Sequence, residues 1–567
     1  MKVPSGNPAA ESDTAAQPRT AGETERDTLV AEVARLRAGY EALLGPLADA
    51  ILNRRRLEGE IAAAYNSRGW RAGRKLVSLH DRALRVFRVP LRILSVPRRV
   101  VRALLNIREL SRRVVRALLN IRELPRRVLR IVRRLVRYTL RLPKFGLNRC
   151  FGLVTRAASW RRLHLGRPRT MWGVTPILTL PLLARCDRLL GLRSDSLVFT
   201  TYYITNSFDI NLKRLCERVY AKYPRLTTPL HHAILRWALI RYDVFHLFCD
   251  RSLLLPTRRM ELNEQEMRAM RHHGRRLYTY TYGADVRTRE ATLALGRYNL
   301  CADCPEPGRF CMCDDTEGSA NISRISTSAT AMMAMGDMLS YVPGARNFHF
   351  WPLDVAAMRY VGTRWSKGQT LRIAHAPNHP HFKGTHHLVD AIERLQGEGR
   401  AIELVRVQGV PNNEVIALFE SCDLVADQFI AGFHGYTALE AMAVGKPVLC
   451  YLRDPSMTID AAVCPMINTW PDTIYQTLRD CLDGCFDLAE LGRRSRAYVE
   501  HYYSLEAVAL RLGALYLETA GFPERINLRM RKRMALLEAG LTPVLPGPLP
   551  VSWDSVADID ERVEQVA

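Results

Sequence analysis

Short apolar runs alternate with longer amphipathic stretches between residues 195 and 520, and this pattern predicts an α/β fold. The apolar runs have the length and the β-branched or aromatic content of buried strands, and the segments between them are long enough for helices. Repeated strand and helix units of this kind build parallel sheets. We expect the body to begin near residue 196 and a hinge to lie between residues 351 and 370. The expected strands are residues 197–202, 244–249, 277–280, 371–375, 402–407, 424–427 and 448–450, with a helix at residues 211–220.

We divide the body into two domains, residues 171–360 and 361–520, followed by a C-terminal tail at residues 521–567. Residues 1–25 are polar and rich in Ala, Ser and Thr, which predicts a disordered tail. In residues 26–66 apolar positions follow a four-and-three spacing, which predicts a short coiled coil and a homodimer formed through it. A lone amphipathic helix that docks on the body explains so few heptads equally well.

An internal repeat fills residues 67–170. Residues 98–110 recur identically as residues 112–124, and a looser copy begins at Arg126. Apolar positions of the copies share one face, arginines flank that face, and prolines stand near the joints, which predicts short basic amphipathic helices. Residues 68–169 hold 30 Lys and Arg residues against three acidic ones, and the whole chain has a net charge of +25. The rest of the chain is therefore almost neutral.

The basic segment has three candidate partners: an anionic membrane surface, nucleic acid, and the body of the protein. Basic amphipathic helices suit an anionic membrane, where each Lys or Arg contributes about 1 kcal/mol. Two observations argue against nucleic acid. Few aromatic residues accompany the arginines, and contacts to phosphates do not require a broad apolar face. We expect membrane attachment, with packing against the body as the third alternative.

Sequence features also bear on location. The chain has no run of eighteen apolar residues that could span a bilayer, and residues 1–25 lack the apolar core of a signal peptide. Its 13 cysteines, an odd number, do not resemble a disulfide framework. We expect a cytoplasmic protein that is peripheral on the inner face of the cell membrane.

Four cysteines, Cys301, Cys304, Cys311 and Cys313, fall within thirteen residues. Four thiolates at this spacing could close a tetrahedral zinc site, structural rather than catalytic. The Cys-x-Cys half is less usual than Cys-x2-Cys, and four reduced cysteines or a redox-sensitive pair explain the same residues. Both interpretations stay open.

Two turns carry the most specific chemistry. The run His381-Phe-Lys383-Gly384-Thr precedes, further along the chain, Gly435-Tyr-Thr-Ala-Leu-Glu440-Ala-Met-Ala-Val-Gly445. A lysine beside a helix N-terminus can bind a diphosphate, because the cation and the free N–H groups both attract negative charge. A carboxylate on the neighbouring helix can accept hydrogen bonds from the hydroxyls of a ribose. These turns predict a site for a sugar nucleotide.

Both turns resemble the C-terminal domain of the glycosyltransferase family 4 enzymes, also called group 1 glycosyl transferases. The run Tyr280-Thr-Tyr282-Gly283-Ala-Asp285-Val-Arg287 is similar to a turn in the family's first domain, and residues 493–503 are similar to its C-terminal helix, which returns to that domain. The resemblance covers roughly residues 195–520. It implies the GT-B architecture, in which two Rossmann-like domains, an N-terminal acceptor domain and a C-terminal donor domain, face a cleft. It also implies transfer with retention of configuration.

The resemblance also implies residue roles. Asp285, Lys383 and Glu440 take the catalytic positions. Donor-binding residues are His379, Lys383, Gly384, Gly409, Val410, Gly435, Tyr436, Thr437 and Glu440, and acceptor-side residues are Tyr282, Gly283 and Asp285. The chain departs from the family at three positions: Gly432 replaces the first acid of a Glu-x7-Glu pair, Asn378 replaces an arginine, and Tyr282 replaces a histidine. The missing acid faces the transferred sugar in the family, so the departure concerns the identity of that sugar.

The sequence as a whole indicates a glycosyltransferase that moves a hexosyl or related group from a nucleoside-diphosphate sugar to a membrane-associated, lipid-linked or cell-envelope glycan acceptor. Polysaccharide biosynthesis is the process this implies. No cofactor is required, because lysine and helix dipoles can stabilise the departing diphosphate. The alternatives are a catalytically inactive GT-B scaffold tethered to the membrane and a nucleic-acid-binding protein.

Overall fold

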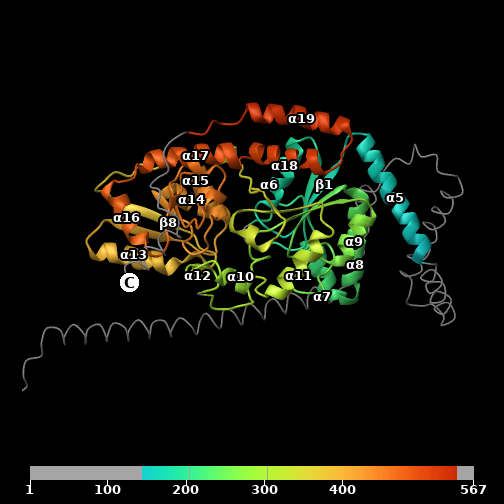
Figure 1. Cartoon of the computed structure of the whole chain (residues 1–567), viewed down its shortest axis with the longest axis horizontal. Coiled ribbons are helices and arrows are strands. Elements are labelled where there is room, and N and C mark those ends of the chain that lie inside the picture. The colour runs from blue at the N-terminus through green and yellow to red at the C-terminus, as the bar shows by residue number, and fades with distance from the viewer. Residues whose placement is uncertain (1–143, 203–204, 303, 546–567) are drawn as a thin grey trace, which may run out of the picture. The chain divides into compact units, whose positions relative to one another are not determined.

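The computed structural model describes residues 144–202, 205–302 and 304–545. The predicted disordered tail, the predicted coiled coil, the repeats before residue 144 and residues 546–567 lie outside this part. The described residues form two parallel sheets with helices on their faces (Figure 1). None of the helices in this part of the chain is both long enough and apolar enough to cross a membrane.

The first sheet has seven strands in the order β3-β2-β1-β4-β5-β6-β7, all parallel. Chain order reverses between β1 and β4, as in dinucleotide-binding folds. The strands are β1 Arg169–Val174, β2 Arg193–Val198, β3 Ile210–Asn211, β4 Val244–Phe248, β5 Arg276–Tyr280, β6 Ala331–Ala334 and β7 Arg346–Asn347. The helices of this domain are α5 Lys144–His164, α6 Leu180–Leu189, α7 Lys213–Lys222, α8 Thr227–Arg241, α9 Glu264–His272, α10 Arg289–Leu293 and α11 Asp315–Ser326, with 3-10 turns at Pro224–Leu226, Gly336–Tyr341 and Val355–Ala357.

The body begins earlier than the sequence predicted. The expected start near residue 196 is wrong, because β1 lies in the middle of the first sheet, paired with β2 and β4. Thr170, Met171, Trp172 and Val174 of β1 are buried. The predicted domain boundary at residue 171 falls within β1, but no strand was predicted at residues 169–174, which directly follow the basic segment. The strand expected at residues 197–202 is β2, and it begins at Arg193.

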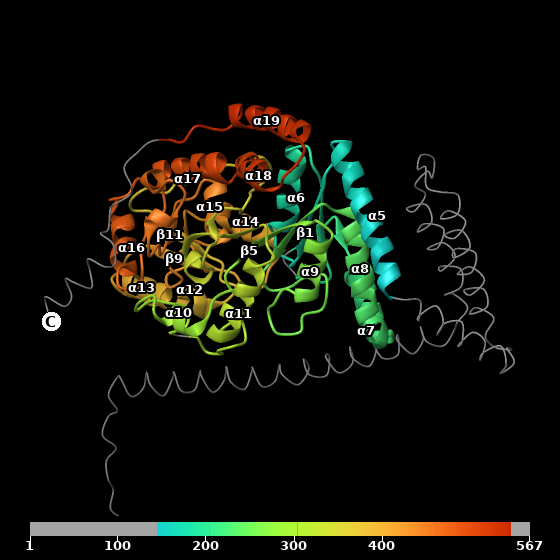
Figure 2. The same cartoon turned by 45° about the vertical axis from the view of Figure 1, so that its right-hand side comes forward.

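The last part of the basic segment packs on the body. Helix α5 lies along α8 (Figure 2). Ser159 Oγ donates to Asp243 Oδ1 at 2.6 Å, and Arg162 donates to both carboxylate oxygens of Asp243 at 2.9 and 2.8 Å. For residues 144–164, therefore, the alternative of packing against the body is the one observed.

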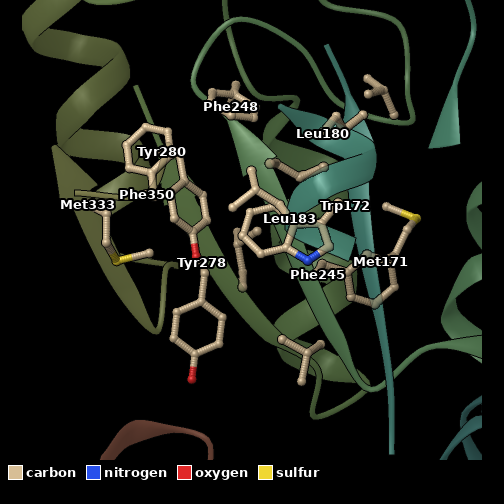
Figure 3. Packing of buried hydrophobic residues seen from close by; sticks show 14 of the residues in the cluster. Met171, Trp172, Leu180, Leu183, Phe245, Phe248, Tyr278, Tyr280, Met333 and Phe350 are labelled. Atoms are coloured by element: carbon tan, nitrogen blue, oxygen red, sulfur yellow. The ribbon is translucent and has the colours of Figure 1, made fainter. Parts of the chain in front are cut away.

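Large side chains fill the core of the first domain (Figure 3). Trp172 of β1, Phe245 of β4, and Tyr278 and Tyr280 of β5 are fully buried in this core, together with Leu183 of α6. Burying an aromatic side chain of this size removes much apolar area from water, at about 25 cal/mol per Å². This packing holds rigid the strand ends that carry the polar loops described below.

The second sheet has five parallel strands in the order β12-β11-β10-β8-β9. Chain order reverses between β8 and β10. Apolar clusters cover both faces of the sheet. The elements are β8 Leu371–His375, α12 Pro380–Lys383, α13 Thr385–Gly397, β9 Ile402–Arg406, α14 Asn412–Ser421, β10 Leu424–Ala426, α15 Tyr436–Ala443, β11 Val448–Cys450, β12 Ile467–Asn468 and α16 Ile474–Asp483, with 3-10 turns at Pro455–Met457 and Ala461–Val463.

Two chain segments that lie side by side connect the two domains. The backbone N–H of Leu353 donates to the carbonyl of Tyr503 at 2.7 Å, and Leu353 forms a parallel bridge with Ser504. Helix α17 Leu488–Tyr503 packs on α15 of the second domain, and α18 Leu505–Thr519 packs on α6 of the first (Figure 1). Residues 493–503 therefore stay with the second domain, and α18 makes the predicted return. The expected tail contains a further helix, α19 Glu524–Ala539, which packs on α18.

Candidate functional site

The candidate donor site lies where strand order reverses in the second sheet. Lys383 follows β8 and Asp427 follows β10, and β8 and β10 are neighbours. The Nζ of Lys383 lies 2.5 Å from Asp427 Oδ1, and the two side chains are 15% and 0% exposed. His375 supports this corner, because its ring nitrogens lie 2.8 Å from the carbonyl of Ala426 and from Thr385 Oγ1 at the start of α13.

Helix α15 begins against this ion pair. The backbone N–H of Gly435, the N-cap of α15, donates to Asp427 Oδ2 at 2.6 Å. A Cβ atom at Gly435 would lie 3.0 Å from Lys383 Nζ and 3.1 Å from each Asp427 oxygen, so only glycine fits without displacing the pair. The first N–H groups of a helix have no carbonyl partner within it and are available to an anion. The structure thus brings Lys383 and Gly435 together and adds Asp427.

Glu440 lies on α15 and is buried. Its Oε1 accepts a hydrogen bond of 2.7 Å from Asn412 Nδ2 at the start of α14. Burial raises the pKa of Glu440 to about 7, with Asn412 and Lys383 acting against the rise and Asp427 adding to it. Gly409 and Val410 lie in the loop before α14, separated from that helix by Pro411. The Asn412–Glu440 hydrogen bond therefore links the element after the predicted base-binding backbone to the predicted ribose ligand.

Other predicted donor residues have different surroundings. The Tyr436 hydroxyl donates to the carbonyl of Pro352 at 2.8 Å and holds the connection between the domains, while Thr437 is half-buried. Gly384 separates α12 from α13 in a left-handed conformation, φ 67°. Burial, with His381 nearby, lowers the pKa of His379. Burial therefore favours the neutral form of the His379 ring.

On the acceptor side, Asp285 holds a turn. Its Oδ1 accepts from the N–H groups of Tyr282 and Gly283, both at 2.9 Å, and its Oδ2 accepts from the N–H of Cys249 at 3.3 Å. Burial, followed by the charge of Asp250, raises the pKa of Asp285 to about 7. Both carboxylate oxygens are occupied by backbone donors.

The sequence interpretation missed Asp250, which lies where strand order reverses in the first sheet. Thr175, directly after β1, donates to Asp250 Oδ1 at 2.6 Å. Arg251 Nε and the Tyr282 hydroxyl donate to Oδ2 at 2.7 and 3.3 Å. The signal was present: Asp250 and Asp427 are each the first acidic residue after an apolar strand. Asn412 had no comparable local signal.

The cysteine-bearing segment reaches the donor loops from the first domain. The Phe310 ring lies 4.8 Å from the His379 ring and 5.8 Å from the Phe382 ring, and the carbonyl of Tyr298 accepts from Arg453 Nη2 at 2.7 Å. The loops at the carboxyl ends of the two sheets therefore meet.

The four clustered cysteines are free thiols, with Cys301 buried and Cys304, Cys311 and Cys313 half-buried. Burial and the neighbouring thiols raise the pKa of Cys311 to about 11. Across residues 144–302 and 304–545, apart from 203–204, no three potential ligands converge on a metal position. The zinc site stays a prediction from the sequence.

No family model and no curated protein matches the chain. Solved structures show weak similarity. HepE of Anabaena, crystallised with UDP and glucose, is 12% identical, with a TM-score of 0.40 over 62% of this chain and 99% of that chain. Sucrose-phosphate synthase of Thermosynechococcus elongatus is 13% identical, with a TM-score of 0.42 over 62% and 98%. The glycosyltransferase SnogD of Streptomyces nogalater is 16% identical, with a TM-score of 0.31 over 63% and 100%.

Proposed function

We propose that this chain is a glycosyltransferase of the GT-B architecture that takes its sugar from a nucleoside-diphosphate donor. The observation that carries the proposal is the meeting of Lys383, Asp427 and the start of α15 at the strand-order reversal of the second sheet. Open parallel sheets bind ligands at this point, because the loops after the two strands diverge there. A diphosphate supplies the negative charge that a lysine and free helix amides bind.

In the proposed donor complex the diphosphate lies against the first turn of α15 and accepts hydrogen bonds from Lys383. Asp427 holds the ammonium group beside the helix before substrate arrives. Negative charge grows on the diphosphate as its bond to the sugar breaks, and a cation and amides already in place stabilise that charge without reorganising. The step requires no cofactor.

Glu440 receives the ribose in this proposal, and the backbone of Gly409 and Val410 receives the base. The carboxyl group has one donor in the structure, Asn412, and can accept hydrogen bonds from ribose hydroxyls. Hydrogen bonds to the charged form of a carboxyl lower its pKa, so the bound ribose favours ionised Glu440.

The acceptor is assigned to the first domain, where Asp250 and Tyr282 meet at the strand-order reversal. A hydroxyl of a glycan, lipid-linked or cell-envelope acceptor can donate to Asp250, as the Thr175 hydroxyl does in the structure. Asp285 acts indirectly, because it fixes the turn that carries Tyr282. We propose transfer with retention of configuration.

Isothermal titration with ADP, CDP, GDP, UDP and dTDP tests the donor site. We expect one base to bind, with Glu440→Gln weakening the ribose nucleotide about tenfold and its 2′-deoxy analogue little, since a carboxylate accepts hydrogen bonds more strongly than an amide. Glu393→Gln, an exposed change on α13, is the control. If no nucleotide binds, the proposal fails. If a nucleotide binds but the sugar nucleotide is neither transferred to an acceptor nor hydrolysed, the inactive scaffold is favoured.

We propose that the basic segment attaches the enzyme to the inner face of an anionic membrane. The support is its excess of Lys and Arg, 30 against three acidic residues in residues 68–169, beside an almost neutral remainder. Deleting residues 68–140 should abolish sedimentation with phosphatidylserine vesicles and leave nucleotide binding intact. Equal sedimentation of both proteins, or preferential binding of the full chain to duplex DNA, would contradict this attachment.

A further inference from the structure

Two arginines, one from each domain, lie over glycines in the loops that meet between the sheets. Arg287 follows β5, and its guanidinium covers Gly283, where any Cβ atom would overlap Nη1. Arg453 follows β11 and covers Gly432 in the same way. Both glycines have positive φ, 110° and 85°, a region that other residues rarely adopt. The backbone is thus shaped to admit the two guanidinium groups.

These arginines are incompletely paired. Arg287 Nη2 donates to Asp337 Oδ2 at 2.8 Å, and Arg453 Nη2 donates to the carbonyl of Tyr298 at 2.7 Å. The Nε of Arg287, the Nε of Arg453 and Oδ1 of Asp337 are buried and have no hydrogen-bond partner. The Asp337 side chain is 7% exposed. Leaving a buried polar group unpaired is costly, so three such atoms in one region require an explanation.

The three atoms belong to one neighbourhood. Burial raises the pKa of Tyr341, and the charges of Arg287 and Arg453 both act against that rise while Asp337 adds to it. Gly336, the neighbour of Asp337, has no room for a Cβ atom because the ring of Phe433 lies against it. Phe433 adjoins Gly432, so the Asp337 loop lies on the Arg453 loop.

The neighbourhood carries an excess of positive charge. Asp337 compensates Arg287, and in residues 144–545 as described Arg453 takes part in no ion pair. Burial lowers the pKa of the nearby His434 to about 4, so that ring is neutral near pH 7. Lys383 and Asp427 compensate one another. The Arg453 guanidinium donates to the Tyr298 carbonyl and lies over the Tyr451 ring, but it has no carboxylate partner among the described residues.

We propose that Arg453 selects a donor whose sugar carries a carboxylate, a uronic acid, and that Asp337 accepts a hydroxyl of the same sugar. The inference rests on the proposed function, which places the diphosphate at Gly435, three residues after Gly432. A sugar attached to that diphosphate and directed toward the first domain meets Arg453 and the Arg287–Asp337 pair. Two N–H donors and one carboxylate acceptor match a ligand that has both an acidic group and hydroxyls, and a guanidinium pairs well with a carboxylate.

Entry of this sugar requires the loops to part, because the unpaired atoms are covered in the structure. The connection between the domains consists of two adjacent segments, at Leu353 and Ser504. Movement of one domain relative to the other about these two segments opens the region without breaking either sheet. Closure over an acidic sugar then satisfies the three atoms.

The test compares matched sugars on the base that the diphosphate titrations identify: the nucleoside diphosphate, its neutral hexose and the 6-carboxylate of that hexose, for example UDP, UDP-glucose and UDP-glucuronate. We expect the wild type to bind the acidic sugar nucleotide about ten- to a hundredfold more tightly than the neutral one, from charge-assisted hydrogen bonds. Arg453→Gln should remove this preference and leave affinity for the diphosphate unchanged. Arg453→Lys keeps the positive charge but loses the paired N–H donors of the guanidinium, so it should keep part of the preference for the acidic sugar. Arg297→Gln, at a side chain 74% exposed in the adjoining loop, is the control.

The outcomes separate the two proposals. Diphosphate binding with equal affinity for neutral and acidic sugars overturns the role of Arg453 and leaves the proposed function standing. Equal loss of diphosphate and acidic-sugar binding in Arg453→Gln assigns Arg453 to the phosphates and also overturns the inference. If no diphosphate binds, both proposals fall. Should the variants not fold, the wild-type comparison alone still decides.

Discussion

The two sheets reverse strand order at corresponding places, and each place holds a buried aspartate, but the partners of the two aspartates differ. Asp427 pairs with the Lys383 ammonium and the amide that begins α15. Asp250 accepts from two hydroxyls, those of Thr175 and Tyr282, and from its neighbour Arg251. A lysine beside a helix start suits an anion, whereas a carboxylate among hydroxyls suits a neutral alcohol. This difference is the reason why the proposed function places the diphosphate in the second domain and the acceptor hydroxyl in the first.

A second carboxyl group lies near each aspartate, and the same contrast recurs. Burial raises the pKa of both Glu440 and Asp285 to about 7. Asp285 is held through both oxygens by three backbone N–H groups, while Glu440 receives its side-chain hydrogen bond from Asn412. Asp285 is therefore part of the framework, and Glu440 can still bind a ligand.

The largest expected effect separates the two aspartates by stability. Asp427→Asn leaves the Lys383 ammonium, 15% exposed, without a counter-charge, and breaking a buried pair in this way costs about 3 kcal/mol of unfolding free energy. Asp250→Asn should cost less, because Arg251 is 35% exposed and reaches water. Urea denaturation measures both. The double variant Lys383→Met/Asp427→Leu should recover most of the unfolding free energy lost in Asp427→Asn. If Asp427→Asn and Asp250→Asn lose equal unfolding free energy, the two aspartates do not differ as their partners indicate.

The next effect concerns binding. A cation that meets a diphosphate contributes about 1.5 to 3 kcal/mol, so Lys383→Met/Asp427→Leu should bind the nucleoside diphosphate about ten- to a hundredfold more weakly. Thr175→Val, beside the other aspartate, should leave this affinity unchanged. Calorimetry on folded protein measures both. Unchanged affinity in the double variant removes Lys383 from the site.

The third effect is a pH dependence. A carboxyl whose folded pKa is raised above its unfolded value is protonated in the folded state between the two values, so stability falls as pH rises from about 4.5 to about 7. Bound ribose favours ionised Glu440. Affinity for the sugar nucleotide should therefore increase as pH rises from 6 to 8 in the wild type and stay flat in Glu440→Gln. Asp285→Asn should reduce the slope of the stability profile, in which the contribution of Glu440 remains, and should leave the pH dependence of affinity unchanged. A wild-type affinity independent of pH would contradict the ribose assignment.

The sequence predicted those features that local residues determine. Strands at residues 424–427 and 448–450 are confirmed as β10 and β11, and the glycine that begins α15 was evident from its turn. The pairing of Lys383 with Asp427 was not predictable, because it depends on β8 and β10 being neighbours although β9 lies between them in the chain. Sheet order is set by packing over the whole domain and leaves no mark on either loop.

Two other failures have similar causes. Strand β1 was hidden by its position after a run of arginines, although its own side chains are buried. The chain breaks at Ser504 between α17 and α18, and α18 packs on the first domain. No glycine or proline at this position indicates the break in the sequence. Its signal was weak but present, since the Ser504 hydroxyl accepts from the N–H of Ala507 at 3.2 Å, as an N-cap does. The guanidinium of Arg453 over Gly432 joins two loops that no local pattern connects.

The smallest expected effect tests the acceptor half of the comparison. Tyr282→Phe removes one hydrogen bond, from the hydroxyl to Asp250 Oδ2 at 3.3 Å, and at that length it should cost less than about 1 kcal/mol of stability. Nucleotide affinity should not change, because the hydroxyl belongs to the first domain. The rate of transfer at a fixed acceptor concentration should fall severalfold, with KM for the acceptor rising, because Tyr282 helps to orient the carboxylate that receives the acceptor hydroxyl. Tyr223→Phe, at a side chain 56% exposed directly after α7, is the control. If Tyr282→Phe instead weakens the nucleotide and spares the acceptor KM, the two strand-order reversals do not divide the substrates as their aspartates indicate.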